Sequence, residues 1–300
     1  MRFQGSTGKA ADTVKITTET QLCAVIGNPV AHSLSPAMHN AAFQAAGLDY
    51  VYVAFRVEDV KGCLEGMRAL PGFRGMSVTI PHKTAVMPHL DEIDALARQV
   101  GCVNTITNDA GRLKGTVTDG VGTLRAFADA GVSLEGRRVL FLGAGGAVRA
   151  VAFAMAGMAG VAGITVLGRS RSRLDSLVND LRCAVSTPVG AGSLDTDIDA
   201  ALRTHDVLVQ GTPVGMFGHD PGSSCVPREG LRREHVVFDM VYRPLKTRLI
   251  EDAEAAGCAV ILGLEMLLQQ AVLQFETWTG TTAPHEAMRA ALLAELQEVR

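Results

Sequence analysis

Short apolar stretches alternate with amphipathic segments along the first third of the chain. Apolar runs at residues 22–26, 50–55 and 75–79 predict strands, and the helical spacing of apolar residues predicts helices at 36–46 and 57–70. An order in which strands alternate with helices indicates a largely parallel sheet that is covered by helices.

A second series of the same kind follows, with strands expected at 139–142, 164–167, 207–210, 236–239 and 258–262. The long apolar helix after Leu264 is expected to return to the first part of the chain. The predicted fold class is therefore α/β with two domains. One is an N-terminal α/β domain of residues 21–121 that is completed by the C-terminal helices of residues 264–300. The other is an inserted Rossmann-type domain of residues 122–263, and residues 1–20 are expected to form a flexible tail.

A glycine-rich turn follows the first strand of the second series. Glycines allow a sharp turn and leave backbone N–H groups free for a pyrophosphate at the start of the next helix. The following strand ends in arginines at 169–173, and no acidic residue stands there to bind a ribose 2′-hydroxyl, so a 2′-phosphate and hence NADP is predicted, with NAD left open. The alternative is a turn that serves packing alone. Arg171 is out of phase and is expected to point elsewhere. The cofactor candidates in this region are Gly143, Ala144, Gly145, Gly146, Ala147, Arg169, Ser170 and Arg173.

Composition and charge exclude several classes of protein. A net charge of −3 without a long basic block argues against nucleic acid as a partner. No apolar run reaches the roughly 18 residues that span a bilayer, and no apolar signal core begins the chain, so a cytoplasmic protein without a membrane partner is expected. The six cysteines form no C-x-x-C pair, so reduced thiols are expected and no metal site.

Polar residues gather in segments that follow or end the apolar stretches of the first domain: 27–36, 77–83, 101–105 and 118–120. We expect these segments to project from the same edge of the sheet, where α/β folds bind ligands. Their hydroxyl and amide groups suit a polyhydroxylated ring, and one amine and one carboxylate suit proton transfer. Ser35 is expected to be the N-cap of a helix, where its hydroxyl serves either the helix or a bound anion.

The amine is Lys83 and the carboxylate is Asp119. A lysine near an aspartate and a nicotinamide cation can accept a proton at neutral pH if its pKa is lowered. Which of the two takes the proton first stays open. The alternatives are a solvated lysine at the start of a helix and an aspartate that caps the helix from Val121. His32 and His82 are expected to form hydrogen bonds that stabilise loops, because no further ligand is spaced for zinc.

The chain resembles the shikimate dehydrogenase family over residues 21–280, in the blocks GNPVAHSLSP, VTIPHK, GCVNT, TDG, GAGGA, GRSRSR and GLEMLLQQ. The resemblance implies an NADP-dependent oxidoreductase of aromatic amino acid biosynthesis, the chorismate pathway, that converts shikimate reversibly to 3-dehydroshikimate with Lys83 and Asp119 as the catalytic pair. It implies that Ser33 and Ser35 hold the substrate carboxylate. Further implied substrate contacts are Thr79, Asn104, Asp119, Tyr242 and Gln270, and further implied cofactor contacts are Thr212, Met240 and Gly263. The protein is expected to be a monomer or a homodimer.

Two positions depart from the family pattern. Ser77 and Val117 stand where many members have asparagine, and both changes remove an amide that can form hydrogen bonds. Because lost hydrogen-bonding groups weaken discrimination between hydroxylated acids, a quinate or aminated-analogue dehydrogenase remains an alternative, as does NAD preference. A second alternative is a ligand sensor that keeps the fold without the chemistry, and retention of both Lys83 and Asp119 argues against it.

Glycines occur where the chain is expected to cross between the two domains, at 120–122 and at Gly263. Glycine can absorb a change in backbone angles, so hinges are predicted at both places. The domains are then expected to close over the substrate.

Overall fold

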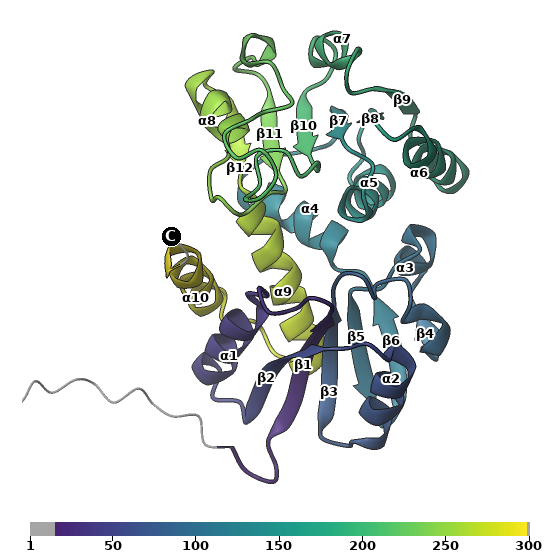
Figure 1. The fold of residues 1–300 in the computed structure, drawn as a ribbon, viewed down its shortest axis with the longest axis vertical. Helices are drawn as coiled ribbons and strands as arrows, with labels where there is room; N and C mark the ends of the chain where they lie inside the picture. Colours follow the sequence, from purple (N-terminus) through teal and green to yellow (C-terminus); the bar gives the residue numbers. More distant parts are fainter. Residues whose placement is uncertain (1–15, 299–300) are drawn as a thin grey trace, which may run out of the picture.

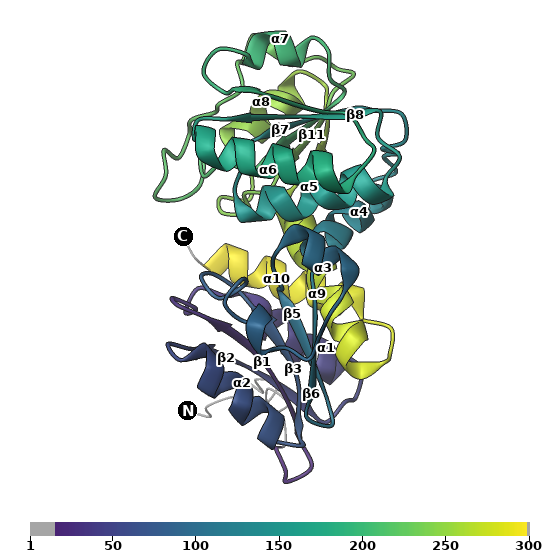
Figure 2. The same ribbon diagram turned by 90° about the vertical axis from the view of Figure 1, so that its right-hand side faces the viewer.

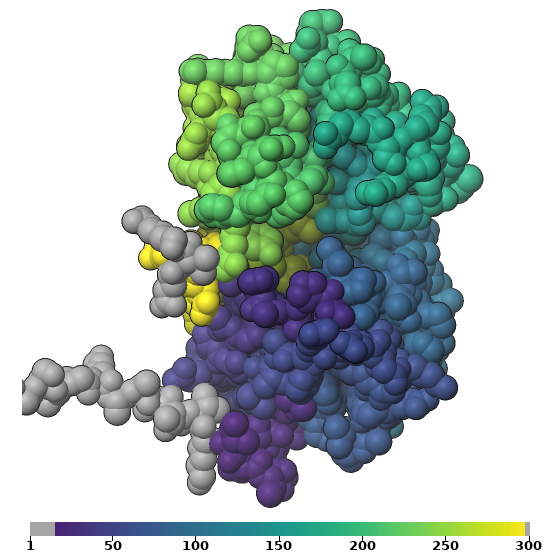
Figure 3. All heavy atoms as spheres, viewed as in Figure 1, coloured from purple at the N-terminus to yellow at the C-terminus, as the bar shows by residue number. Residues whose placement is uncertain are grey.

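The computed structural model of the protein describes residues 16–298, which contain two separate six-stranded sheets. The sheets lie at opposite ends of the molecule, with the helices α4 (Asp119–Asp129) and α9 (Gly263–Thr279) between them, as Figure 1 shows. In the space-filling view, the green atoms of the second domain rest directly on the purple atoms of the first (Figure 3). The predicted two-domain α/β fold is confirmed.

The first sheet has the strand order β2-β1-β3-β5-β6-β4. Its strands are β1 (Gln21–Gly27), β2 (Tyr50–Arg56), β3 (Phe73–Val78), β4 (Glu92–Ile93), β5 (Thr105–Asp109) and β6 (Arg112–Thr116). β1 pairs in parallel with β2 and β3, but β5 is antiparallel to both β3 and β6. The sheet is therefore mixed rather than largely parallel. The sequence missed β4 to β6 because these strands are short and mostly polar.

Helices cover both faces of the first sheet. They are α1 (Ser35–Ala45), α2 (Val60–Ala69), α3 (Ala95–Val100) and the 3-10 helix η1 (Met87–His89). Alternate residues of β1 point to opposite faces: Cys23 and Val25 share a core with α1 and α9, whereas Ala24 and Ile26 belong to the core that includes α2. Burial on both faces explains why β1 is apolar throughout.

The second sheet has the order β12-β11-β10-β7-β8-β9, and all its strand pairs are parallel. Counted from β7, this is the 3-2-1-4-5-6 order of a Rossmann fold, which binds its ligand where the order reverses, between β7 and β10. The elements are β7 (Arg138–Leu142), α5 (Gly146–Met158), β8 (Gly163–Gly168), α6 (Arg171–Ala184), β9 (Val189–Ser193), α7 (Ile198–Leu202), β10 (Val207–Gln210), η2 (Arg228–Gly230), β11 (Val236–Asp239), α8 (Arg248–Ala255) and β12 (Ala259–Ile261).

The residues of β7 alternate between two cores. Val139 and Phe141 pack in the core that includes α5 and α6, and Leu140 and Leu142 pack in the core that includes α7 and α8. The strand is therefore buried on both faces, which is why it reads as an unbroken apolar run.

The α9 helix returns to the first domain, as predicted. The Trp278 indole on α9 donates to the Ile106 carbonyl at 3.1 Å, and a Cβ at Gly75 of β3 would lie 2.1 Å from the same indole. α10 (His285–Glu298) follows and packs against α1 and α9. Figure 2 shows α9 and α10 beside α1, below the second sheet. None of the helices in residues 16–298 has the length and apolar character that a bilayer crossing requires.

The glycines of the first predicted hinge lie inside α4. A Cβ at Gly120 would lie 2.5 Å from the Ala150 carbonyl oxygen of α5, and a Cβ at Gly122 would lie 2.8 Å from the Gln270 nitrogen of α9. These glycines let α4 approach both neighbouring helices closely. Close packing therefore accounts for both glycines, and a hinge at 120–122 stays a prediction.

The predicted tail lies mainly outside the described residues. Within them, the hydroxyl groups of Thr17 and Thr20 donate to the Asp49 carboxylate at 3.3 and 2.6 Å. Residues 17–20 are therefore attached to the first domain.

Candidate active site

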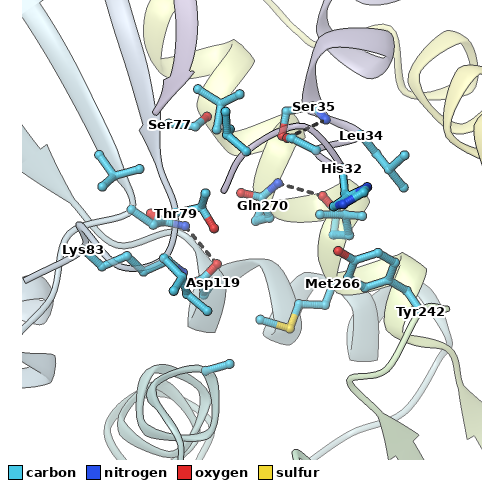
Figure 4. A pocket seen from close by; sticks show the side chains of 18 of the residues that line it. His32, Leu34, Ser35, Ser77, Thr79, Lys83, Asp119, Tyr242, Met266 and Gln270 are labelled. Carbon is cyan, nitrogen blue, oxygen red and sulfur yellow. Dashed lines mark hydrogen bonds and ion pairs between the residues drawn. The ribbon is translucent and has the colours of Figure 1, made fainter. Parts of the chain in front are cut away.

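A cavity of about 470 Å³ opens between the two domains. Its walls carry every residue that the resemblance linked to substrate or proton transfer: Ser33, Ser35, Thr79, Lys83, Asn104, Asp119, Tyr242 and Gln270. Ala147, Met240 and Gly263 line it from the second domain. Figure 4 shows Lys83 and Asp119 pointing toward each other across one side of this space, with Gln270 and Ser35 on the other.

Lys83 and Asp119 form an ion pair, with the lysine Nζ 2.6 Å from the carboxylate Oδ2. Lys83 lies in a turn after β3 rather than at the start of a helix, and Asp119 is the first residue of α4, whose N-cap is Thr118. Neither alternative reading, a helix-start lysine or a capping aspartate, describes these two residues. Their charged groups meet at the edge of the cavity.

The pKa of Lys83 lies above its ordinary value. Burial lowers the pKa, but the negative charge of Asp119 and its hydrogen bond raise it by more. From the sequence, proton acceptance by Lys83 at neutral pH was conditional on a lowered pKa, and this structure does not meet that condition. Lys83 is an ammonium ion here, the form that donates a proton to a carbonyl oxygen.

Asn104 holds the other oxygen of the carboxylate. Its Nδ2 donates to Asp119 Oδ1 at 2.9 Å and to Thr118 Oγ1 at 3.0 Å, and its Oδ1 accepts from the Thr118 backbone N–H at 2.9 Å. The Asn104 side chain is buried, 3 % exposed. Asp119 is thus held from both sides, by an amide and by an ammonium group.

Ser33 and Ser35 lie at the beginning of α1. Ser35 is the first residue of this helix and Leu34 is its N-cap, without a side-chain capping bond, so the expectation that Ser35 caps the helix was wrong. The Ser35 backbone N–H points to Ser33 Oγ at 3.3 Å. Two hydroxyl groups at the positive end of a helix dipole are suited to a carboxylate.

The Ser77 hydroxyl is fully engaged. It accepts from the Tyr52 hydroxyl at 2.6 Å and donates to Gln274 Oε1 at 2.8 Å. Gln274 lines the cavity and was missed by the sequence analysis, although it lies four residues after Gln270 on the same face of α9. An amide thus stands close to the position where Ser77 lacks one. Val117, the other departure, is buried.

The two histidines differ. His82 is buried, and its Nε2 forms a hydrogen bond with the Val57 carbonyl at 2.8 Å, as expected for a loop-stabilising residue. His32 is exposed at the cavity and forms no side-chain hydrogen bond with any of residues 16–298, so the expectation was wrong for it.

The glycine-rich turn has the geometry of a dinucleotide site. Gly143 has φ of +104°, a conformation that favours glycine, and Gly145 is the N-cap of α5 without a side-chain capping bond. The first N–H groups of α5 are therefore free to bind an anion. Thr212 lies beside the turn, with its Cγ2 3.2 Å from where a Gly143 Cβ would be. Gly263 begins α9 so close to β11 that a Cβ would meet the Met240 carbonyl oxygen at 2.7 Å.

A second cavity of about 290 Å³ lies at this turn and is lined by Ala144, Gly145, Gly146, Arg149, Ser172, Arg173, Ser176 and Leu177. Arg149 was not anticipated. Its guanidinium group pairs with Asp180 at 2.7 Å and also bonds to the Val100 carbonyl at the end of α3, so it joins the two domains beside the turn.

The basic end of β8 leaves two arginines free. Arg171 pairs with Asp175 at 2.8 Å, whereas Arg169 and Arg173 are exposed and have no ion-pair partner within residues 16–298. Ser170 is the N-cap of α6. Two free guanidinium groups at the end of this strand suit a phosphate on the ribose. The described residues contain no group of three His, Cys, Asp or Glu side chains placed to hold a metal ion.

Comparisons with known proteins agree with this geometry. Residues 25–106 match the shikimate dehydrogenase substrate binding domain, and residues 263–293 match the shikimate 5'-dehydrogenase C-terminal domain. The shikimate dehydrogenase (NADP(+)) of Methanopyrus kandleri is 43% identical over 288 residues, which cover 95% of this chain and 99% of that protein.

Two solved structures are similar over the whole fold. Shikimate 5-dehydrogenase from Listeria monocytogenes, in complex with shikimate and NAD, has a TM-score of 0.89 and 36% identity, covering 93% of this chain and 99% of that one. Quinate dehydrogenase from Corynebacterium glutamicum, in complex with NAD, has a TM-score of 0.86 and 32% identity, covering 92% and 99%. The chain belongs to the shikimate dehydrogenase family.

Proposed function

We propose that the protein is an NADP-dependent shikimate dehydrogenase that interconverts shikimate and 3-dehydroshikimate. The observation that carries the proposal is the Lys83–Asp119 ion pair, 2.6 Å long, in a cavity with walls from both domains. The relative from Methanopyrus kandleri, 43% identical, is named for this activity with NADP(+).

The proposed substrate site divides into two halves. Ser33 and Ser35 bind the carboxylate, because they present hydroxyl groups at the N-terminus of α1. The ring hydroxyls are bound by a second group of cavity residues: Thr79, Asn104, Asp119, Tyr242 and Gln270.

The chain's own groups move the proton. In reduction, the Lys83 ammonium donates a proton to the ketone oxygen while the carbon receives a hydride, and Asp119 keeps the lysine charged and in place. In oxidation, the hydroxyl proton passes to the Lys83–Asp119 pair. NADP supplies the hydride acceptor or donor when it is bound.

The proposed cofactor site lies at the carboxyl ends of β7 and β10. The free N–H groups at the start of α5 bind the pyrophosphate, and Arg169 and Arg173 bind the 2′-phosphate. Thr212, Met240 and Gly263 lie on the path toward the substrate cavity. We also propose the domain division given by the sequence, with 122–263 inserted between 21–121 and 264–300.

A spectrophotometric panel tests the proposal. Absorbance at 340 nm is followed with NADP and shikimate, then with NAD, then with quinate in place of shikimate. We expect the highest kcat/KM for NADP with shikimate. A higher kcat/KM for quinate would assign the protein to the activity named for its Corynebacterium glutamicum neighbour, and cofactor and substrate binding without turnover would make it a sensor.

A further inference from the structure

A chain of buried hydrogen bonds connects Tyr52 to the Lys83–Asp119 pair. Its members come from three strands, the residue before β5, α4 and α9, and all are nearly inaccessible to solvent: Tyr52 1%, Ser77 5%, Gln274 1%, Thr105 0%, Asn104 3% and Asp119 6% exposed. The family blocks quoted above include Thr105 and Asn104, but neither Tyr52 nor Gln274 belongs to them.

The hydrogen bonds of this series run in one direction, from Tyr52 to Asn104. The phenol of Tyr52 donates to Ser77, so the Ser77 proton goes to Gln274 Oε1. The Gln274 amide therefore presents its N–H groups to Thr105 Oγ1 at 2.9 Å, and the Thr105 proton goes to Asn104 Oδ1 at 2.8 Å. Burial raises the pKa of Tyr52, which keeps the phenol neutral and able to donate.

The last two steps reach the charged pair. The Asn104 oxygen accepts from Thr105 at 2.8 Å and from the Thr118 backbone N–H at 2.9 Å, so its NH₂ group faces Asp119, where it donates to Oδ1 at 2.9 Å. An Asn104 amide in the opposite orientation would place its oxygen against a carboxylate oxygen and repel it. The direction of the Asn104 side chain, and with it the place of Asp119, thus depends on two donors, the Thr118 backbone N–H and the Thr105 hydroxyl.

We propose that Gln274 and Thr105 are positioning residues that, together with the Thr118 backbone N–H, fix the Asn104 amide and thereby hold the Asp119 carboxylate against Lys83. This inference rests on the proposed function for its catalytic consequence, but not for its geometry. Gln274 also donates to the Asn104 carbonyl at 3.4 Å, so both of its N–H groups are used within the protein. Neither residue needs to touch the substrate.

The test compares Thr105→Val, which keeps the shape but removes the hydroxyl, with Thr105→Ser, which restores it. Gln274→Met removes the Gln274 amide from this series of hydrogen bonds, and Gln269→Met is its control. Gln269 also lies on α9 and is 4% exposed, but its side chain forms hydrogen bonds with Asp129 and His285. Both variants lose a buried amide from the same helix, but only Gln274 belongs to the series of hydrogen bonds that leads to Asp119.

Two quantities are measured. The first is the pKa of Lys83 in the protein without substrate, from NMR of the lysine ¹³Cε resonances, with Lys83→Arg used to assign its signal. The second is kcat and KM with NADP and shikimate. We expect Thr105→Val and Gln274→Met to lower the Lys83 pKa, because Asp119 no longer holds its charge beside the lysine. We expect kcat to fall by about tenfold, the effect of one lost hydrogen bond to a charged group, with KM for NADP unchanged.

Thr105→Ser and Gln269→Met should keep both the Lys83 pKa and kcat of the wild type. If Thr105→Val and Gln274→Met fold and leave the Lys83 pKa unchanged, the inference is wrong, even if the wild type oxidises shikimate. If the wild type shows no turnover, the proposed function is wrong. The Lys83 pKa of the variants against that of the wild type still decides whether Thr105 and Gln274 hold Asp119 in place. If the Gln274→Met protein does not fold, Thr105→Val against Thr105→Ser decides alone.

Discussion

Lys83 is the residue on which the proposed chemistry depends most directly. It belongs to the first domain and lies apart from the glycine-rich turn, so its removal should leave cofactor binding intact. We expect Lys83→Ala to lower turnover by about 10² to 10⁴, the range for a lost acid–base group, while NADP affinity stays at the wild-type value. Turnover and NADP binding by fluorescence titration measure the two effects. A variant that keeps wild-type turnover would exclude Lys83 as the proton donor.

Asp239 at the end of β11 is buried, and burial disfavours its charged form. Burial raises its pKa from 3.8 to about 6, against hydrogen bonds from Thr247 and the Val241 N–H that lower it. Because the pKa of Asp239 is higher in the folded than in the unfolded state, the protonated carboxyl group favours the folded state. This stabilising contribution is complete below pH 3.8 and is lost as the pH rises through 6. At pH 7 the ionisation of Asp239 lowers the free energy of unfolding by about 3 kcal/mol, since one pKa unit corresponds to about 1.4 kcal/mol.

We therefore expect Asp239→Asn to gain stability relative to the wild type as the pH rises from 4 to 7. Asparagine keeps the shape and stays neutral throughout this range. Urea unfolding at several pH values measures the free energy of unfolding of both proteins. A constant difference between them from pH 4 to pH 7 would show that Asp239 ionises without penalty.

At the scale of elements, α4 packs closely against α5 and α9 because it carries glycines at both contacts. We expect Gly120→Ala to destabilise the protein by about 1 to 3 kcal/mol, the usual cost of overpacking, because the new Cβ would lie 2.5 Å from a backbone oxygen. The control is Gly66→Ala in the middle of α2, where no atom lies within 4 Å of the new Cβ. That variant should gain about 0.5 to 1 kcal/mol from helix propensity. Equal effects in thermal unfolding would contradict this account of α4.

The arginines at the end of β8 are expected to set the cofactor preference. We expect Arg169→Ala to reduce kcat/KM for NADP by about 10- to 100-fold, the loss of a hydrogen bond to a charged phosphate, and to leave NAD nearly unchanged. Arg171→Ala is the matched control, because Arg171 already pairs with Asp175. Kinetics with both cofactors measure the ratio. If Arg169→Ala weakened NADP and NAD equally, the 2′-phosphate would not be its partner.

At the scale of the whole molecule, the substrate cavity has walls from both domains, and Arg149 joins the domains beside the glycine-rich turn. We expect shikimate and NADP together to draw the domains closer, because bound ligands contact both walls at once. Small-angle X-ray scattering should give a smaller radius of gyration with both ligands than with either alone. An unchanged radius would show that the cavity is already closed.

The sequence by itself determined the features that are local in the chain. Buried parallel strands appear in the sequence as apolar runs. Neighbouring residues also suffice to identify the Gly143 turn, the arginines after β8 and the polar segments at strand ends. The sequence also placed α9 with the first domain, because a helix so apolar needs a second surface to cover it.

Only the tertiary structure decided how distant polar groups meet. The antiparallel pairing of β5 joins short polar strands that carry no strong period, and Gln274 reaches Thr105 across more than half of the chain. The sequence left the direction of the Lys83 pKa shift undetermined for the same reason. Its value depends on how closely Asp119 is held, and that distance is set by contacts between elements rather than by the order of residues.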